Sequence, residues 1–397
     1  MSLPMGLICL ALGGGMATLP LVIYPAMLYA LTLFSRAPIP PRSAAPHATV
    51  IVAFTGGGAL LRAKVTNLAR IARTYPGELD LVLAGDGPIT AADREAALAA
   101  AQGLPVTLCA LDAPAGKAHA LNLGADRANG DILVFSDLDA ELSNSALDVL
   151  LRWFADPSVG AVCGRRLIVH QDRAAVAESG QRAYTDFDSR IKLLENRLGA
   201  ITSNDGKLYA VRRSLFQPIH PAATDDLYNA LSVVAQGQRV LFEPQAMAYI
   251  PAPARTAGHD LTRRRRVTLR SLTGLFARPH LLLTLRFGLF GPRLIVNKLL
   301  RRLLPVAGLL TGLGLLLLAP THTWPNGVLA MALAGSLIAA AYPPAMRTGL
   351  TARLPQRLKK LWATGFYAGL GMLGMLLGVL DFLRGKRIAR WAPRKTA

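Results

Sequence analysis

Long apolar stretches stand near both ends of the chain. Residues 5–34 contain no charged side chain, and a helix needs about 20 apolar residues to cross a bilayer. Three later segments are also long and apolar: Leu303–Pro320, Trp324–Met346 and Leu361–Leu383. The first of these three is at the lower limit of spanning length. The pattern predicts one membrane helix before the central region and a cluster of membrane segments after it.

The first apolar stretch is typical of a membrane span rather than of a cleaved signal peptide. A signal peptide carries a basic segment before its apolar core, whereas no Lys or Arg precedes Arg36. Basic residues gather on the cytoplasmic side of membrane helices. Because the positive charge follows this span, we expect the N-terminus outside and the central region in the cytoplasm.

The central region alternates short apolar runs with amphipathic ones. The predicted strands are Ala48–Phe54, Leu79–Ala84, Val106–Leu111, Ile132–Phe135 and Lys207–Arg212, and the predicted helices are Arg62–Thr74, one that follows Lys117, and Leu227–Gln236. Such alternation is typical of an α/β domain with a mostly parallel sheet.

The composition favours a membrane protein. Of the 397 residues 52% are hydrophobic, the mean hydropathy is +0.34 and the formal net charge is +20, which is too apolar for an ordinary soluble domain. The three cysteines have no C-x-x-C spacing and the seven histidines no ligand spacing. Neither a disulfide framework nor a zinc site is therefore indicated.

Two acids separated by one residue follow the strand Ile132–Phe135. Side chains at i and i+2 of an extended segment point the same way, so Asp137 and Asp139 can share one cation. Carboxylate oxygens suit Mg²⁺ or Mn²⁺, which completes its shell with water and substrate phosphates. A polar loop after a strand is the alternative interpretation.

Three further places offer candidate chemistry. Asp86 lies in a glycine turn after a strand, where it could contact a base or ribose, and Lys117 could place a charge on a diphosphate. Thr224-Asp225-Asp226 opens a predicted helix. An N-cap and acids in a first helical turn explain these three residues without catalysis, whereas an acid facing the crevice could serve as a general base.

Basic residues gather between the central region and the last apolar segments. The block RRRRVTLR at 263–270 fits nucleic acid, lipid headgroups or a diphosphate, and the neighbouring membrane segments make nucleic acid the least favoured partner. Leu281–Leu304 mixes leucines with five basic residues, which predicts an amphipathic helix in the cytoplasmic interface.

The positive charge near the C-terminus conflicts with a simple topology. Arg347–Lys360 contains five basic residues and Arg384–Lys395 contains six, so both are expected in the cytoplasm. A single membrane span between these two segments would place them on opposite sides of the membrane. Either Leu361–Leu383 re-enters and returns, or the tail is an exception.

The order of these motifs resembles that of the membrane-integrated family 2 glycosyltransferases, which include hyaluronan, cellulose, chitin and poly-N-acetylglucosamine synthases. The resemblance covers roughly Val50–Thr273. Its most specific part is GKAHALNLGADRANGDILVFSDLDAEL at 116–142, followed by GKLYAVRRSLF at 206–216 and by Thr224-Asp225-Asp226 where the family has T-E-D. The resemblance implies a GT-A fold, a nucleotide-sugar donor, most often a UDP-sugar, and inversion at the anomeric carbon.

The resemblance also implies roles for single residues. Asp86 matches the acid that contacts the nucleotide base, and Lys117 the lysine near the diphosphate. Asp137 matches the first acid of the metal motif, and Asp139 the direct ligand of Mg²⁺ or Mn²⁺. Asp226 matches the last acid of T-E-D, the catalytic base. Arg263 and Arg266 belong to the segment that matches the family's Q-x-x-R-W, near the donor diphosphate.

Two positions depart from the family. Ala53–Gly58 stands where the family usually has P-x-[YF]-N-E, which leaves fewer polar groups for the nucleoside. Val267 replaces the tryptophan of Q-x-x-R-W and offers no aromatic face to an acceptor sugar. This leaves room for transfer of a single sugar to a lipid instead of synthesis of a polysaccharide.

The sequence thus predicts a GT-A domain between membrane segments. The expected parts are a membrane helix at 1–35, a cytosolic domain at 36–280, an interface helix at 281–302, membrane segments at 303–383 and a basic tail at 384–397. The expected activity is sugar transfer in the bacterial inner (cytoplasmic) membrane to a cell-envelope or extracellular polysaccharide. Expected partners are a nucleotide-sugar donor, a glycan or lipid acceptor, membrane lipids and secretion or polymerisation proteins. A non-catalytic component of a secretion complex is the alternative.

Overall fold

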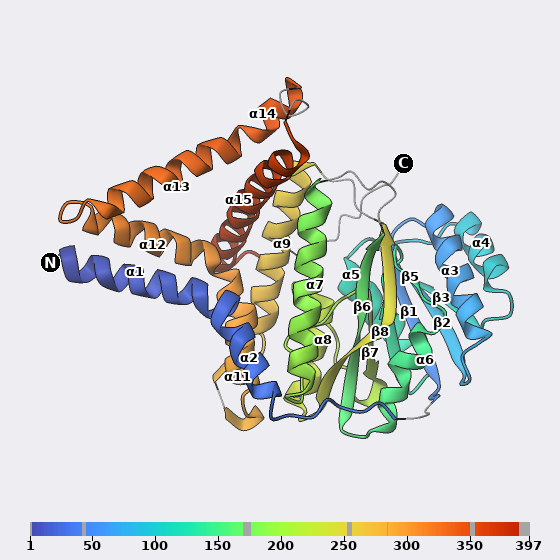
Figure 1. The fold of residues 1–397 in the computed structure, drawn as a ribbon. Coiled ribbons are helices and arrows are strands. Elements are labelled where there is room, and N and C mark those ends of the chain that lie inside the picture. The colour runs from blue at the N-terminus through green and yellow to red at the C-terminus, as the bar shows by residue number, and fades with distance from the viewer. Residues whose placement is uncertain are drawn as a thin grey trace.

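The computed structural model describes residues 2–41, 45–169, 176–251, 256–283, 285–349 and 354–388. A sheet covered by helices forms one side of the molecule, and a group of long apolar helices projects from the other (Figure 1). The long helices α7 (Val176–Asn196) and α9 (Ala257–Phe276) lie between these two parts.

One eight-stranded sheet organises the first part, in the order β3-β2-β1-β4-β7-β6-β8-β5. Its strands are β1 (Ala48–Phe54), β2 (Leu79–Gly85), β3 (Val106–Ala110), β4 (Ile132–Ser136), β5 (Glu141–Leu142), β6 (Val159–Val169), β7 (Leu208–Arg212) and β8 (Arg239–Pro251). The first four strands pair in parallel, as do β6 and β8. The β4–β7, β6–β7 and β5–β8 pairs are antiparallel. The sheet is therefore mixed: parallel pairing, as predicted, prevails in its first half and recurs at β6–β8, while the β7 and β5 pairings are antiparallel.

Helices cover both faces of this sheet. They are α3 (Gly58–Ala72), α4 (Ala91–Ala101), α5 (Lys117–Asp126), α6 (Ala146–Leu151), α8 (Asp225–Ala235) and two short 3₁₀ turns, η2 (Arg152–Ala155) and η3 (Arg213–Leu215). One apolar core contains residues of α3, α4 and α6, and the other contains residues of α5, α8 and α9. Every residue of β1 is buried, as expected for a strand covered on both faces.

Long apolar helices form the second part. They are α1 (Ser2–Thr18), which continues through a π-helical turn η1 (Leu19–Ile23) into α2 (Tyr24–Thr32), then α12 (Leu304–Leu318), α13 (Trp324–Ala340), α14 (Tyr342–Arg347) and α15 (Gln356–Leu383). Among the described residues, three helices are long and apolar enough to cross a membrane: Leu3–Thr32, Trp324–Arg347 and Gln356–Leu383. A fourth candidate combines Phe290–Leu300 with Leu304–Leu318, which meet at 70°. These segments agree with the predicted ones, and the chain is compatible with a membrane protein.

The segment 281–302 differs from its prediction. It contains α10 (His280–Leu283), η4 (Leu285–Phe287), α11 (Phe290–Leu294) and the π-helical η5 (Ile295–Leu300) instead of one continuous helix. Gly288 has a φ of +59°, a backbone conformation that ends a helix at little energetic cost for glycine only. Much of the polar face also points inward. Asn297 is buried and donates to Thr202 Oγ1 at 2.7 Å, and Lys298 donates to Ser203 Oγ at 2.6 Å.

The N-terminal helices are tied to the sheet domain through α7. The Tyr24 hydroxyl donates to the buried Glu195 carboxylate, which also accepts from the backbone N–H of Thr202 at 2.8 Å and from Asn297 at 3.3 Å. Glu195 therefore joins α2, α7 and η5 to the loop that leads into β7. The three cysteines, Cys9, Cys109 and Cys163, are buried and form no disulfide.

Candidate active site

Asp137 and Asp139 follow β4 at the centre of the sheet. Lys207, which directly precedes β7, places its Nζ 2.9 Å from Asp137 Oδ2 and 2.6 Å from Asp139 Oδ1. The antiparallel β4–β7 pairing brings Lys207 to this point, since Ser136 of β4 lies opposite Leu208 of β7. The two carboxylates of the D-x-D sequence therefore face a common point, which a cationic nitrogen occupies.

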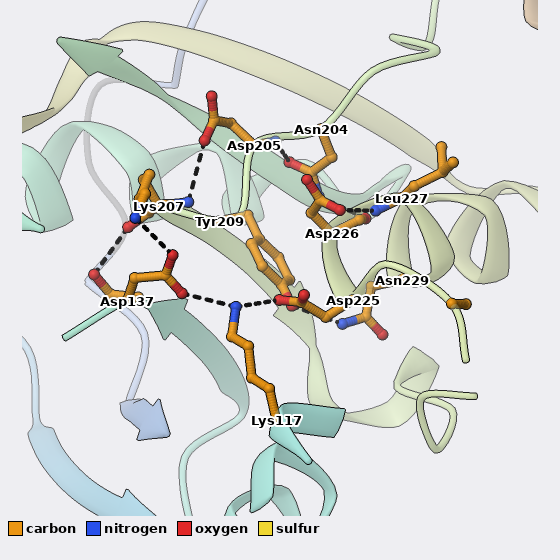
Figure 2. Close-up of polar contacts among 12 residues, drawn as sticks. Lys117, Asp137, Asn204, Asp205, Lys207, Tyr209, Asp225, Asp226, Leu227 and Asn229 are labelled. Carbon is orange, nitrogen blue, oxygen red and sulfur yellow. Dashed lines mark hydrogen bonds and ion pairs between the residues drawn. The ribbon is translucent and has the colours of Figure 1, made fainter. Parts of the chain in front are cut away.

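Lys117 connects this pair to a second pair of acids. Its Nζ lies 2.7 Å from Asp137 Oδ1 and 2.8 Å from Asp225 Oδ2 (Figure 2). Burial lowers the pKa of Lys117, but Asp137 and Asp225 outweigh this effect and raise the pKa above its usual value. Burial raises the pKa of Asp137, whereas Lys117 and Lys207 outweigh that effect and hold it below the usual range. Both groups are therefore charged at neutral pH.

Asp86 supports the turn that carries Lys117. Its side chain is buried at the end of β2, and its Oδ1 accepts from the backbone N–H groups of Ala115 and Gly116 at 2.7 and 2.8 Å. Gly116 has a φ of +113°, which few other residues adopt. The structure thus places Asp86 close to the predicted donor site and gives it a structural role there. Its contact with a nucleotide base stays a prediction.

Asp226 is in a different electrostatic position from its neighbour Asp225. Burial and the repulsion of Asp225 raise the pKa of Asp226 to about 6, although a hydrogen bond from the Leu227 N–H, 2.7 Å long, opposes the change. Figure 2 shows Lys117 pointing to Asp225, while Asp226 points toward Leu227. A carboxylate with a pKa near 6 is ionised at neutral pH and basic enough to accept a proton.

Helix capping is the alternative interpretation of Thr224-Asp225-Asp226, and the structure shows it only in part. Thr224 is the N-cap residue of α8, but its side chain makes no capping hydrogen bond. Asp225 uses its carboxylate for Lys117 instead of the helix N-terminus. Helix capping alone therefore does not explain all three residues.

Helix α9 brings arginines toward the same acids. Arg263, Arg266 and Arg270 recur at spacings of three and four residues, so they share one helical face. Arg270 donates to the carbonyl oxygen of Ala223. Burial lowers the pKa of Arg270, and the charges of Asp225 and Asp226 oppose this change. Burial and the charge of Arg270 lower the pKa of Arg266. The structure thus places Arg266 beside Arg270, and a role of Arg263 at the donor stays a prediction.

Lys64 is a buried residue of this site that the sequence analysis missed. It lies on α3, is 2% exposed, and donates to Ser136 Oγ at 2.7 Å and to the Ala140 carbonyl at 2.6 Å. These acceptors stand on either side of Asp137 and Asp139. Burial lowers the pKa of Lys64 to about 7, although both aspartates oppose the change. The available signal was a lysine that directly precedes Val65 on the buried face of an amphipathic helix.

The donor atoms of the D-x-D sequence suit a divalent cation. Across the described residues, no group of three or more His, Cys, Asp or Glu side chains could hold a metal ion. Two carboxylates facing one point nevertheless suit Mg²⁺ or Mn²⁺, which commonly takes one or two protein carboxylates and completes its shell with water and phosphate oxygens. The donor set at Asp137 and Asp139 fits such an ion.

Comparison with known proteins defines the class of this domain. Residues 49–219 match the family described as glycosyl transferase family 2. The O-antigen chain rhamnosyltransferase RfbN of Salmonella typhimurium (strain LT2) is 30% identical over 130 residues, which cover 30% of this chain and 40% of that relative. The chain therefore matches less than half of the length of this relative.

A solved structure with a similar fold covers nearly the whole chain. It is the mannosyltransferase PcManGT from Pyrobaculum calidifontis in complex with GDP-Man and Mn²⁺, with a TM-score of 0.69 and 23% sequence identity over 98% of this chain and 100% of that one. This similarity and the mixed sheet define a glycosyltransferase fold of the GT-A type. Residues 49–219, a little under half of the chain, carry the match to glycosyl transferase family 2.

Proposed function

We propose that this protein is an inverting glycosyltransferase that moves a sugar from a nucleoside-diphosphate sugar to an acceptor hydroxyl. The observation that carries the proposal is the pair of acids at the start of α8. Asp225 is bound by Lys117, whereas Asp226 is half-buried, has a pKa of about 6 and forms no ion pair with Lys117, so its carboxylate is proposed for proton transfer. The family match and the fold support the same class.

The proposed step is a single displacement. The Asp226 carboxylate takes the proton of the acceptor hydroxyl as that oxygen attacks C1 of the donor sugar. The bond from C1 to the diphosphate oxygen breaks, and its electron pair leaves with the nucleoside diphosphate. Because attack and departure occur on opposite faces of the sugar, the configuration at C1 inverts and no covalent enzyme intermediate forms.

The proposed donor-binding residues follow β2 and β4, open α5 or lie on α9. Lys117 and Arg266 supply positive charge for the diphosphate, and Asp86 holds the turn next to the nucleoside. Asp137 and Asp139 would hold Mg²⁺ or Mn²⁺, which neutralises charge on the diphosphate when bound. Arg263 completes the proposed basic face of α9.

The proposed acceptor is a growing cell-envelope or extracellular polysaccharide. The second candidate is transfer of one sugar to a lipid, and the position of α9 favours it. Helix α9 carries Val267 in place of the family's tryptophan and packs between the sheet domain and the apolar helix α15. The segment that would meet the acceptor is therefore next to the apolar part of the molecule.

Transfer of a labelled sugar tests both the activity and the acceptor. Purified protein in nanodiscs that contain bacterial lipids is incubated with Mn²⁺ and a panel of UDP-, GDP- and dTDP-sugars, including GDP-mannose and a nucleotide-linked rhamnose. Label in a polymer supports the polysaccharide acceptor, and label in a chloroform-soluble single-sugar product supports the lipid acceptor. The matched control is Asp226→Asn. Absence of transfer from every donor would contradict the proposed activity.

A further inference from the structure

Helix α15 has the length and composition of a membrane span, but one of its faces is packed against a highly charged helix. Gly371, Gly374 and Gly378 recur along this face. A Cβ atom at Gly374 would lie 2.9 Å from Arg264 Cβ, and one at Gly378 would lie 2.6 Å from the carbonyl oxygen of Arg265. The backbone of α15 is therefore in close contact with α9 at the arginines 263–266.

Two ion pairs on one buried carboxylate reinforce this contact near the end of α15. Asp381 is 1% exposed, and its carboxylate accepts from Arg265 Nη2 at 2.8 Å and pairs with Lys386 Nζ at 2.9 Å. If α15 crossed the hydrocarbon core, the arginines of α9 that pack against it would lie at the same depth. Charged side chains are strongly disfavoured at that depth.

The two ends of α15 contact the same side of the membrane-helix group. Helices α12 and α13 are consecutive and joined by residues 319–323, so the start of α12 and the end of α13 lie on one side of a bilayer that both cross. Trp362, near the start of α15, contacts Tyr342 after α13, with 5.8 Å between ring centroids. Val379, near its end, belongs to the apolar cluster that includes Leu303 and Val306 at the start of α12. Figure 1 shows α15 passing from α14 to the beginning of α12.

We propose that α15 does not cross the membrane but lies along the cytoplasmic leaflet, with α9 beneath it. Among the described helices, α1, α12 and α13 are then the ones that cross the bilayer. Both ends of α15 are then cytoplasmic. The described basic residues around the start of α15 (Arg347, Arg357, Lys359 and Lys360) and those after its end (Arg384, Lys386 and Arg387) consequently lie on the same side, as their charge requires.

The partner of this surface is an anionic lipid leaflet. Leu361 and Leu373 are exposed on α15, and Arg357, Lys359 and Lys360 stand at its start. Apolar side chains beside basic ones are typical of helices that lie in the interface and bind anionic headgroups.

The same pair of helices also fixes the start of α8 relative to the leaflet. Arg270 of α9 donates to the carbonyl oxygen of Ala223, immediately before Thr224. The helix that carries Asp225 and Asp226 is therefore held at a constant position below α15.

Cysteine labelling tests the side of each segment. Single cysteines are introduced as Thr321→Cys between α12 and α13, Thr348→Cys before α15, and Arg387→Cys after it, all at exposed positions. Intact cells are treated with a membrane-impermeant maleimide. The three native cysteines are buried, and the parent protein measures their background.

The proposal predicts a different result for each side of the membrane. We expect the Thr321→Cys protein to be labelled in intact cells, and the Thr348→Cys and Arg387→Cys proteins to be labelled only after permeabilisation. Labelling of the Arg387→Cys protein from outside would overturn the proposal.

The depth of α15 provides an independent measurement. Spin labels are attached at Leu373→Cys on α15 and at the matched control Leu333→Cys on α13, both exposed leucines. In vesicles with anionic lipids, we expect the label at 373 to lie at a shallower depth than the label at 333, with a higher ratio of collisions with a water-soluble nickel reagent to collisions with dissolved oxygen. Equal depth for the two labels would refute the in-plane position of α15.

Discussion

The raised pKa of Asp226 predicts how kcat/KM falls on the acid side of the pH profile. Its pKa of about 6 is well above the usual aspartate value of 3.8. As the proposed catalytic base, Asp226 is then about 90% ionised at pH 7 and about 10% ionised at pH 5, so kcat/KM should fall about 10-fold over this range. An aspartate with its usual pKa would remain mostly ionised at pH 5, and the rate would change little.

Two neighbours allow this reasoning to be tested in both directions. The charge of Asp205 raises the pKa of Asp226 and that of Lys298 lowers it. Asp205→Asn should therefore move the acid limb of kcat/KM to lower pH, and Lys298→Met should move it to higher pH. The assay is initial-rate sugar transfer between pH 4.5 and 8. A kcat/KM that changes little between pH 7 and pH 5, or movement of the acid limb in the same direction in both variants, would refute the assignment of the base.

Three further changes have defined outcomes. Lys64→Met leaves the buried Ser136 hydroxyl and Ala140 carbonyl without their donor, and should reduce the free energy of unfolding of the domain by about 1–3 kcal/mol for each group, measured by denaturant titration. Asp139→Asn should raise the Mn²⁺ concentration needed for half-maximal transfer, and EDTA should abolish transfer reversibly; unchanged metal dependence would contradict this. Gly13→Leu forces its side chain into Thr311 and the Ala307 carbonyl of α12 and should lower thermal stability in detergent, whereas Gly14→Leu, which meets open space, should not.

Much of the fold could be predicted from hydrophobic pattern. The predicted strand Ala48–Phe54 has the same bounds as β1, and the strand at Leu79–Ala84 ends one residue before β2 does. These strands are buried on both faces and therefore appear as continuous apolar runs. The apolar helices could also be located, because a span of this length without charge has few other interpretations.

The direction of β7 and the structure of 281–302 could not be predicted. A short apolar run such as Leu208–Arg212 indicates a strand but carries no information on which way it pairs. The basic residues of 281–302 suggested a surface helix, but Lys298 and Arg293 contact the sheet domain. Burial of polar side chains depends on partners far away in the sequence, which periodicity does not record.

Part of the candidate site could be predicted because its residues occupy characteristic places in the fold. Asp137, Asp139, Lys117 and Asp226 follow strands or open helices at one edge of the sheet, where ligands of such folds bind, and the structure brings Lys117 and Asp137 into contact. No pattern in the sequence distinguishes the electrostatic positions of Asp225 and Asp226. That distinction depends on Lys117, which is 108 residues away and binds Asp225.

Donor binding and sugar transfer by the native protein and by Asp226→Asn can be measured on the same nanodisc preparations. With Mn²⁺, we expect the native protein to bind one nucleotide sugar and to transfer its sugar to an acceptor, and Asp226→Asn to bind this donor with similar affinity while transfer falls by about 10²–10⁴-fold. Donor binding by the native protein without transfer to glycan or lipid, or full transfer by Asp226→Asn, would contradict the proposed function.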